Sequence, residues 1–264
     1  MHPVTLSIAG SDSGGGAGIQ ADLKTFQALG CFGTTAITAI TCQNTLGVTA
    51  IHGVPPEIVR GQIKAVLDDF PVRAIKTGML FSAEIIEVLE ACIPLRDYIA
   101  LVVDPVMVAS SGARLLAPEA ESALKRFLKR ATIITPNVPE AEVLLGRQVF
   151  TLTDMEQAAI DLHAQTSAAV IVKGGHRAEH DKIVRDVFFD GNHVEILEAP
   201  LMDARHTHGT GCTLSAGIAS GLSHGMDLLD AVKLAKEFLI GAIATAPGLG
   251  GGTGPLNHLW KMGK

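Results

Sequence analysis

The chain has 264 residues, 47% of them apolar and 18% charged, a balance typical of globular proteins, so we expect a sizeable core rather than disorder. Its formal net charge of -6 argues against a protein that holds nucleic acid through a basic face. No apolar run reaches the ~18 residues of a membrane span, and the first ten residues do not form a signal peptide. We therefore expect a cytoplasmic protein that binds neither nucleic acid nor membrane.

Apolar runs that fit strands alternate with segments whose apolar residues recur every three or four positions, as in amphipathic helices. In chain order the sequence predicts strand 4–9, helix 19–29, strand 34–41, helix 56–70, strand 74–76, helix 83–91, strand 100–103, helix 119–129, strand 132–135, helix 154–165, strand 168–172, a hairpin of strands 184–190 and 193–197, and helices 213–222 and 228–244. This alternation favours a three-layer α/β/α sandwich with a mostly parallel sheet and a small antiparallel hairpin at its edge.

The domain organisation follows from the absence of any linker, fixed-period repeat or low-complexity block. Open α/β sheets often reach ~250 residues as one unit, so we expect a single domain covering residues 1–264. The four cysteines show neither CxxC pairing nor metal-like spacing, which favours reduced thiols.

Three polar side chains lie where expected strands end. Asp104 and Lys173 come at the ends of two apolar runs, and Asn137 follows a third. Because ligands of open parallel sheets bind at the carboxyl ends of the strands, we expect these residues at one rim.

The strongest local motif is His-Gly-Thr-Gly-Cys-Thr at residues 208–213, directly before an expected helix. Glycines allow successive N–H groups to converge, and the helix dipole favours negative charge at this end. The motif predicts an anion hole. A glycine-rich helix start, capped by Thr210 or Thr213, fits it equally well.

The glycine-rich loop at residues 10–18 fits neither common nucleotide motif. Ile19 stands where GxGxxG needs its third glycine, and GxxxxGK[ST] is absent from the sequence. The loop is either a tight strand-to-helix turn or a place where the backbone approaches a small ligand, with Asp12 or Asp22 as a polar contact.

Glu140 follows two prolines and lies in the first turn of a helix, where a surface carboxylate is common. Paired with Asp104 at the same rim, it could instead hold Mg²⁺ through water. The histidines are a weaker candidate for a metal site. His176, His180, His206 and His208 match no HExxH or Cys/His framework, so surface or loop positions are favoured.

Six ordered motifs resemble those of the hydroxymethylpyrimidine/phosphomethylpyrimidine kinases in the ribokinase-like superfamily. They are residues 9–12 with 14–25, 76–80, 103–107, 135–137, 172–176 and 207–213. The resemblance implies an α/β/α sandwich and a homodimer. It also implies that ATP and Mg²⁺ phosphorylate the hydroxymethyl group of an aminopyrimidine, and then the resulting monophosphate, in thiamine biosynthesis.

The resemblance also assigns roles to individual residues. The phosphate end would comprise an anion hole of Gly209, Thr210 and Gly211, a phosphate contact from Lys173, and Mg²⁺ with its waters organised by Asp104, Asn137 and Glu140. The ring end would comprise Gln43 reading the aminopyrimidine edge, Asp22 and the Gly10 backbone contacting the ring, and Met79 packing on its face.

Cys212 occupies the position where many ribokinase-like sugar kinases carry an aspartate as the base. A thiol with its ordinary pKa of ~8.5 is a poor base at pH 7, but a helix N-terminus beside Lys173 should lower that pKa. We expect the thiolate to accept the proton of the substrate hydroxyl. The alternative is a small packed residue, with the γ-phosphate accepting the proton.

Three other functions remain open. A pyridoxal or pyridoxine kinase also acts on a hydroxymethyl group attached to a nitrogen ring, and neither Gln43 nor Met79 excludes it. A sugar kinase is disfavoured by Cys212. A non-catalytic ligand-binding relative is disfavoured because Asp104, Lys173 and the glycine turn are all present.

Overall fold

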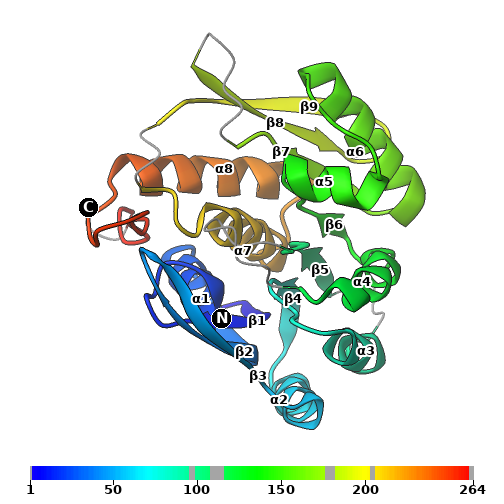
Figure 1. Cartoon of the computed structure of the whole chain (residues 1–264), viewed down its shortest axis with the longest axis vertical. Coiled ribbons are helices and arrows are strands. Elements are labelled where there is room, and N and C mark those ends of the chain that lie inside the picture. The colour runs from blue at the N-terminus through cyan, green and yellow to red at the C-terminus, as the bar shows by residue number, and fades with distance from the viewer. Residues whose placement is uncertain (1, 95–98, 108–115, 176–181, 203–205, 262–264) are drawn as a thin grey trace.

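The computed structural model describes residues 2–94, 99–107, 116–175, 182–202 and 206–261 (Figure 1). Within these residues the strands form one nine-stranded sheet in the order β3-β2-β1-β4-β5-β6-β7-β8-β9. The strands are β1 (Val4–Asp12), β2 (Phe32–Asn44), β3 (Gly47–Gly53), β4 (Val72–Thr77), β5 (Ala100–Val103), β6 (Ile133–Ile134), β7 (Ala169–Lys173), β8 (Ile183–Phe189) and β9 (Val194–Pro200). The six neighbouring strands β2, β1, β4, β5, β6 and β7 are parallel to one another. The remaining strands, β3, β8 and β9, are antiparallel to their neighbours.

Helices cover both faces of this sheet (Figure 1). One face carries α1 (Gly18–Ala28), α7 (Thr210–Ser223) and α8 (Leu228–Ala244). The other carries α2 (Pro56–Asp69), α3 (Ala83–Cys92), the 3₁₀ turn η1 (Pro118–Ala120), α4 (Glu121–Leu128), α5 (Val138–Leu145) and α6 (Leu152–Thr166). The predicted three-layer sandwich is confirmed.

Strands β5 and β6 are apolar throughout, because successive side chains of the central strands point into different cores. Ile75 and Val103 pack with α2 to α6, whereas their neighbours Ala74 and Val102 pack with α1, α7 and α8. Burial on both faces explains why these strands were recognisable as short continuous apolar runs.

The predicted hairpin is confirmed as β8 and β9, but the prediction missed β3 at the opposite edge. No residue of β3 is fully buried, so its sequence carries little of the apolar pattern that marks an interior strand. The prediction also placed the start of α7 too late. Gly209 adopts φ of 87° as its N-cap, and the helix begins at Thr210.

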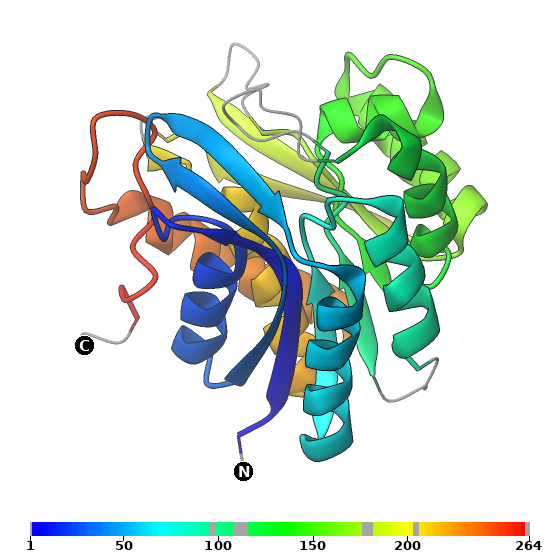
Figure 2. The same ribbon diagram turned by 60° about the horizontal axis from the view of Figure 1, so that its bottom comes forward.

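The C-terminal segment returns to the turn between β2 and β3, as the second view shows (Figure 2). The N–H groups of Gly252 and Thr253 donate to Thr45 at 3.2 and 3.0 Å. Gly254 accepts a hydrogen bond from the backbone of His208 at 3.2 Å, so this segment also supports the approach to α7. Among the helices of the described ranges, none combines the length and hydrophobicity needed to cross a bilayer.

Candidate active site

A cavity of about 540 Å³ opens at the carboxyl ends of the parallel strands. Most of the predicted site residues line it, in an order that follows the sheet: Gln43 on β2, Gly10 on β1, Met79 after β4, Asp104 after β5, Asn137 and Glu140 after β6, Lys173 on β7, and Gly209, Thr210, Gly211 and Cys212 at the start of α7. The expected gathering at one rim is therefore present. For reference, we call the part at β1 and β2 the ring end and the part at β5 to β7 the phosphate end.

The glycine turn before α7 is shaped by close backbone packing. A Cβ at Gly209 would overlap the carbonyl oxygen of Gly16, so the turn lies directly against the first glycine loop. The first N–H groups of a helix have no partner within the helix, and Gly211 and Cys212 of this first turn line the cavity. The geometry fits an anion-binding turn.

Asp104 and Lys173 form a buried ion pair at the phosphate end. Lys173 Nζ lies 2.8 Å from Asp104 Oδ1, with side chains 13% and 2% exposed. The same carboxylate oxygen accepts a hydrogen bond from Thr135 Oγ1 at 3.0 Å. Burial alone would lower the pKa of Lys173, but Asp104 and Glu140 outweigh it and hold the pKa above its usual value. The lysine is thus a fixed positive charge.

Asn137 and Glu140 begin α5 as a capping box. Asn137 Oδ1 accepts from the Glu140 N–H, and Glu140 Oε2 accepts from the Asn137 N–H, both at 2.8 Å. Glu140 is nevertheless buried, and burial together with the charge of Asp104 raises its pKa to about 7 although Lys173 opposes the shift. The carboxylate caps a helix, but it is buried rather than on the surface, and it also lines the cavity. That it helps to hold Mg²⁺ stays a prediction.

The residues present fit a hydrated Mg²⁺. Two carboxylates, Asp104 and Glu140, line one cavity, and the charge of Asp104 disfavours the negative charge of Glu140. A dication relieves this repulsion. Over the described residues no cluster of three or more His, Cys, Asp or Glu side chains could hold a metal by itself. Mg²⁺ commonly uses one or two carboxylates, water and phosphate oxygens, so two carboxylates suffice.

Lys76 is a site residue that the sequence prediction missed. It lines the cavity, and its Nζ lies 2.8 Å from both carboxylate oxygens of Asp22, with both side chains fully buried. Ser7 Oγ donates a third hydrogen bond to Asp22 at 2.5 Å. Burial opposes the charge on Lys76, but Asp22, Cys212 and Asp104 outweigh it and raise the pKa of the lysine.

Asp22 itself does not line the cavity. Its carboxylate is fully buried and enclosed by Lys76 and Ser7, so it does not face the cavity in which we expect the substrate ring to bind. We correct its role to that of the counter-ion that holds Lys76 in place. Sequence reasoning missed the pair because its partners are far apart in the chain.

Gly10 and Met79 approach each other at the ring end. A Cβ at Gly10 would overlap the Met79 methyl group, so a larger residue at position 10 would displace the end of the Met79 side chain. The Met79 backbone is fixed by a hydrogen bond from Thr38 Oγ1 at 2.6 Å. Met79 is 7% exposed and lines the cavity, a geometry that suits an apolar contact with a flat ring.

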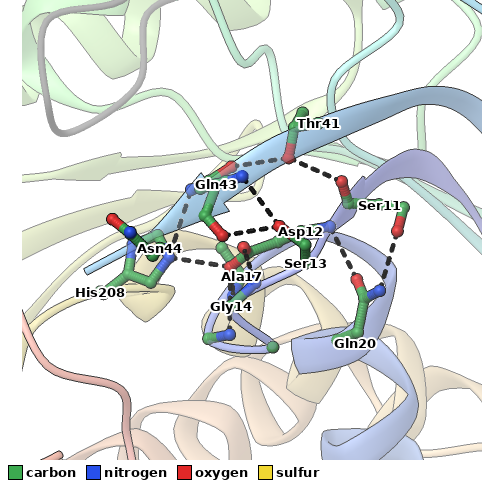
Figure 3. A network of polar contacts seen from close by, with 12 residues as sticks. Ser11, Asp12, Ser13, Gly14, Ala17, Gln20, Thr41, Gln43, Asn44 and His208 are labelled. Atoms are coloured by element: carbon green, nitrogen blue, oxygen red, sulfur yellow. Dashed lines mark hydrogen bonds and ion pairs between the residues drawn. The ribbon is translucent and has the colours of Figure 1, made fainter. Parts of the chain in front are cut away.

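Asp12 and His208 also line the ring end (Figure 3). The carboxylate accepts hydrogen bonds from the N–H groups of Gly14, Gly16 and Ala17 at 2.8 to 3.0 Å. His208 Nε2 lies 2.9 Å from Asp12 Oδ2. Burial would raise the pKa of Asp12, but His208 and the backbone N–H groups outweigh it and lower the pKa. The sequence had left Asp12 open between turn and ligand contact.

The expected thiolate at Cys212 is contradicted. Burial and the charges of Asp22 and Asp104 raise the pKa of this thiol to about 11, although Lys76 and the Gly18 N–H oppose the shift. The expected lowering by a helix N-terminus is therefore wrong in sign. At neutral pH Cys212 is a thiol, and the alternative of a small cavity-lining residue gains support.

Among the described residues, neither His206 nor His208 belongs to a group of three or more His, Cys, Asp or Glu side chains that could hold a metal. His176 and His180 lie outside the described residues. His206 packs closely against Gly254: a Cβ added at residue 254 would lie 2.5 Å from Nδ1 of the His206 ring.

A second cavity of about 130 Å³ adjoins the first and shares Lys173, Gly175, Thr210 and Gly211 with it. Its wall is mainly apolar, with Leu214 from α7 and further aliphatic side chains from α8 and the β8–β9 hairpin: Val184, Ala199, Leu239, Ile240 and Ile243. The two cavities meet at the glycine turn, so two ligands could bring their polar parts together there.

Solved structures define the class of this fold and rim. The crystal structure of an ADP complex of Bacillus subtilis pyridoxal kinase matches with a TM-score of 0.89 and 38% identity, covering 98% of each chain. The fold and the rim are those of a small-molecule kinase.

The family model for phosphomethylpyrimidine kinase matches residues 12–257, and the chain belongs to that family. A hydroxymethylpyrimidine/phosphomethylpyrimidine kinase from Haemophilus influenzae is 48% identical, over 96% of this chain and 95% of its own length. The thiamine biosynthesis bifunctional protein of Geobacter sulfurreducens is 47% identical over 96% of this chain, which spans 52% of that longer protein. The chain is accordingly a phosphotransferase, as the resemblance in its motifs indicated.

Proposed function

We propose that this protein uses ATP to phosphorylate 4-amino-5-hydroxymethyl-2-methylpyrimidine, and then its monophosphate, in thiamine biosynthesis. Its relatives, a hydroxymethylpyrimidine/phosphomethylpyrimidine kinase and a bifunctional protein of thiamine biosynthesis, support this proposal. The observation that carries it is the single cavity whose ring end and phosphate end lie on successive strands of one sheet, from β2 to β7. A ring bound at Gln43, Gly10 and Met79 would direct its hydroxymethyl group towards the glycine turn.

At the phosphate end, Gly209, Thr210 and Gly211 would bind the oxygens of the transferring phosphoryl group through backbone N–H groups. Lys173 would add a positive charge beside them. Phosphoryl transfer needs mainly positioning and stabilisation of charge, so backbone donors and a fixed lysine suit this role.

Mg²⁺ would be held through water by Asp104 and Glu140, with Asn137 orienting Glu140 through the capping box. When bound, the ion would neutralise phosphate charge. Because Cys212 is a neutral thiol, we propose that a phosphate oxygen accepts the proton of the substrate hydroxyl. Lys76 would add positive charge at the same part of the cavity.

The apolar second cavity is where we propose that the base of ATP binds. It meets the first cavity at Lys173 and the glycine turn, which would place the nucleotide phosphates between the two. Its aliphatic lining offers the flat contact that an adenine ring requires.

The test is ATP-dependent phosphorylation of hydroxymethylpyrimidine, its monophosphate and pyridoxal by the same preparation. We expect turnover of both pyrimidines with kcat/KM well above that for pyridoxal. Absence of turnover with either pyrimidine would exclude this function.

A pyridoxal kinase is the second candidate, supported by the high structural similarity to the B. subtilis enzyme. Preference for pyridoxal in the same panel would select it, and Gln43 would then not read an aminopyrimidine. We also propose a single domain, a cytoplasmic location and a homodimer. The one continuous sheet supports the first of these, and light scattering tests the last.

A further inference from the structure

Three side chains from separate parts of the chain meet at the ring end (Figure 3). Asp12 ends β1, Gln43 lies near the end of β2, and His208 immediately precedes the glycine turn. His208 Nε2 lies 2.9 Å from Asp12 Oδ2 and 3.3 Å from Gln43 Nε2. All three line the cavity, so their hydrogen-bonding pattern bears directly on what the cavity binds.

The direction of the first contact follows from Asp12. Its carboxylate is 3% exposed and accepts three backbone N–H groups, an arrangement that stabilises the ionised form. An ionised carboxylate can only accept hydrogen bonds. His208 Nε2 must therefore carry a proton and donate a hydrogen bond to Asp12, whether or not the other ring nitrogen is protonated.

This proton restricts the Gln43 amide. A side-chain amide fits its site in two orientations, because exchanging its oxygen and nitrogen by a 180° rotation hardly alters its shape. In the orientation that Figure 3 shows, the amide nitrogen faces the protonated His208 Nε2, so two donors oppose each other. In the rotated orientation, the amide oxygen faces the His208 N–H, which can then donate to Asp12 and Gln43 together.

The contact at the other end of the amide selects the same rotated orientation. Thr41 Oγ1 lies 2.9 Å from the Ser11 carbonyl oxygen and 3.1 Å from the Gln43 amide. A hydroxyl has one hydrogen, and the Ser11 carbonyl can only accept it. The Thr41 oxygen is then an acceptor towards Gln43, which must offer it an N–H group.

We propose that Asp12, acting through His208 and together with Thr41, fixes the Gln43 amide with its oxygen towards His208 and its nitrogen towards Thr41. One N–H and one oxygen lone pair of the amide are then left for a ligand, in a single spatial order. Asp12, His208 and Thr41 are positioning residues for substrate specificity. This inference rests on the proposed function, because the ligand is taken to be an aminopyrimidine.

The fixed order discriminates between the two candidate substrates. An aminopyrimidine presents an amino donor beside a ring nitrogen that accepts, which complements an amide oxygen and an amide N–H. In pyridoxal, the ring carbon next to the one that bears the hydroxymethyl group carries an aldehyde instead of an amino group. The aldehyde oxygen can only accept a hydrogen bond. A mismatched hydrogen bond in an enclosed site lowers affinity by roughly 10- to 100-fold.

The kinetic test compares Thr41→Val, its control Thr41→Ser, and His208→Leu. The quantity measured is the ratio of kcat/KM for hydroxymethylpyrimidine to that for pyridoxal, or of dissociation constants from calorimetry where turnover is slow. We expect Thr41→Val and His208→Leu to lower this ratio by about 3- to 30-fold, mainly through KM, and Thr41→Ser to keep it within about twofold. Effects of His208 on the glycine turn are shared by both substrates and cancel in the ratio.

A second test does not depend on any substrate. Two-bond ¹H–¹⁵N spectra of the free protein with ¹⁵N-labelled histidine report which ring nitrogens are protonated, and His208→Leu assigns the signal. We expect the Nε2 of His208 to be protonated. An unprotonated Nε2, or an unchanged ratio in both Thr41→Val and His208→Leu, overturns the inference. Wild-type protein that turns over neither pyrimidine instead rejects the proposed function, whatever the tautomer.

Discussion

The ring end and the phosphate end of the cavity differ in how their polar groups are satisfied. At the ring end, the Asp12 charge is matched by three backbone N–H groups and by His208, all supplied by the chain itself. At the phosphate end, Lys173 faces two carboxylates, Asp104 and Glu140, and the pKa of Glu140 is raised to about 7. The first site is electrostatically complete without a ligand, whereas the second is not.

This difference indicates what each end can do. A pre-satisfied network keeps its geometry and can recognise the shape and hydrogen-bonding order of a neutral ring. A group of charges that gains stability from a dication and phosphates binds those ligands strongly and places charge where phosphoryl transfer needs it. Substitutions that affect one end and spare the other test this division.

The largest effect is expected for Lys76→Met, which removes the buried partner of Asp22. Asp22 would remain buried without its partner, and breaking a buried ion pair on one side costs about 3–5 kcal/mol. We expect urea unfolding to show a loss of that size. The double variant Asp22→Asn/Lys76→Met leaves no buried charge without a partner, so it should regain most of the lost unfolding free energy. Equal stability of the single and double variants would contradict the pairing.

Lys173→Met should break the phosphate end alone. Removing a positive group from a transition-state site lowers kcat by roughly 10²- to 10³-fold, while the affinity for hydroxymethylpyrimidine measured by calorimetry should change by less than about threefold. Lys173→Arg, which keeps the charge, is the control and should retain more activity. Equal losses of ring affinity and of kcat would mean that the two ends are not separable.

Position along the strands was enough to predict that three polar residues gather at one rim, whereas Gln43, Gly10 and Met79 were predicted only from the family resemblance. Asp104, Asn137 and Lys173 each follow a recognisable buried strand, and the rule that ligands bind at carboxyl ends brought them together. The glycine turn at residues 209–211 was also visible in the sequence, although the same pattern fitted a capped helix start equally well.

The charge environment was not predictable in the same way. Lys76 lies in the strand sequence Val-Arg-Ala-Ile-Lys-Thr, and nothing local shows that this lysine is buried on Asp22 of a distant helix. The pKa of Cys212 had the wrong expected sign for the same reason. Its local sequence shows a helix N-terminus, whereas the pKa is raised first by burial and then by Asp22 and Asp104, and all three depend on other segments of the chain.

An effect of intermediate size is expected from His258, which contacts the helix that follows the glycine turn and should make the free energy of unfolding depend on pH. His258 Nε2 lies 2.9 Å from Thr213 Oγ1 in the first turn of α7, and burial, with a smaller effect of Lys24, lowers the pKa of this histidine to about 4. The unfolded chain has the ordinary value of ~6.5. Between these two pH values the unfolded state binds more protons, so stability falls as pH falls.

The contribution of His258 is complete above pH ~6.5 and is lost as pH falls through about 4, with a limit of about 3 kcal/mol. Urea unfolding at a series of pH values should show this slope in the wild type and a shallower one in His258→Gln, which keeps a hydrogen-bonding group near Thr213. Identical slopes in the two proteins would show that His258 is not a buried neutral group.

The smallest effect is expected at Cys212, where the two ends meet. If the thiol is neutral at working pH, as a pKa of about 11 requires, its removal deprives the reaction of no base. Cys212→Ala should then keep kcat within about tenfold of the wild type, well short of the loss expected when an essential general base is removed. The pH profile should also remain similar, because no thiolate contributes to it. A loss of 10³-fold or more in Cys212→Ala, with wild-type activity rising as the thiol ionises, would instead restore the cysteine as the base and require that bound substrates lower its pKa.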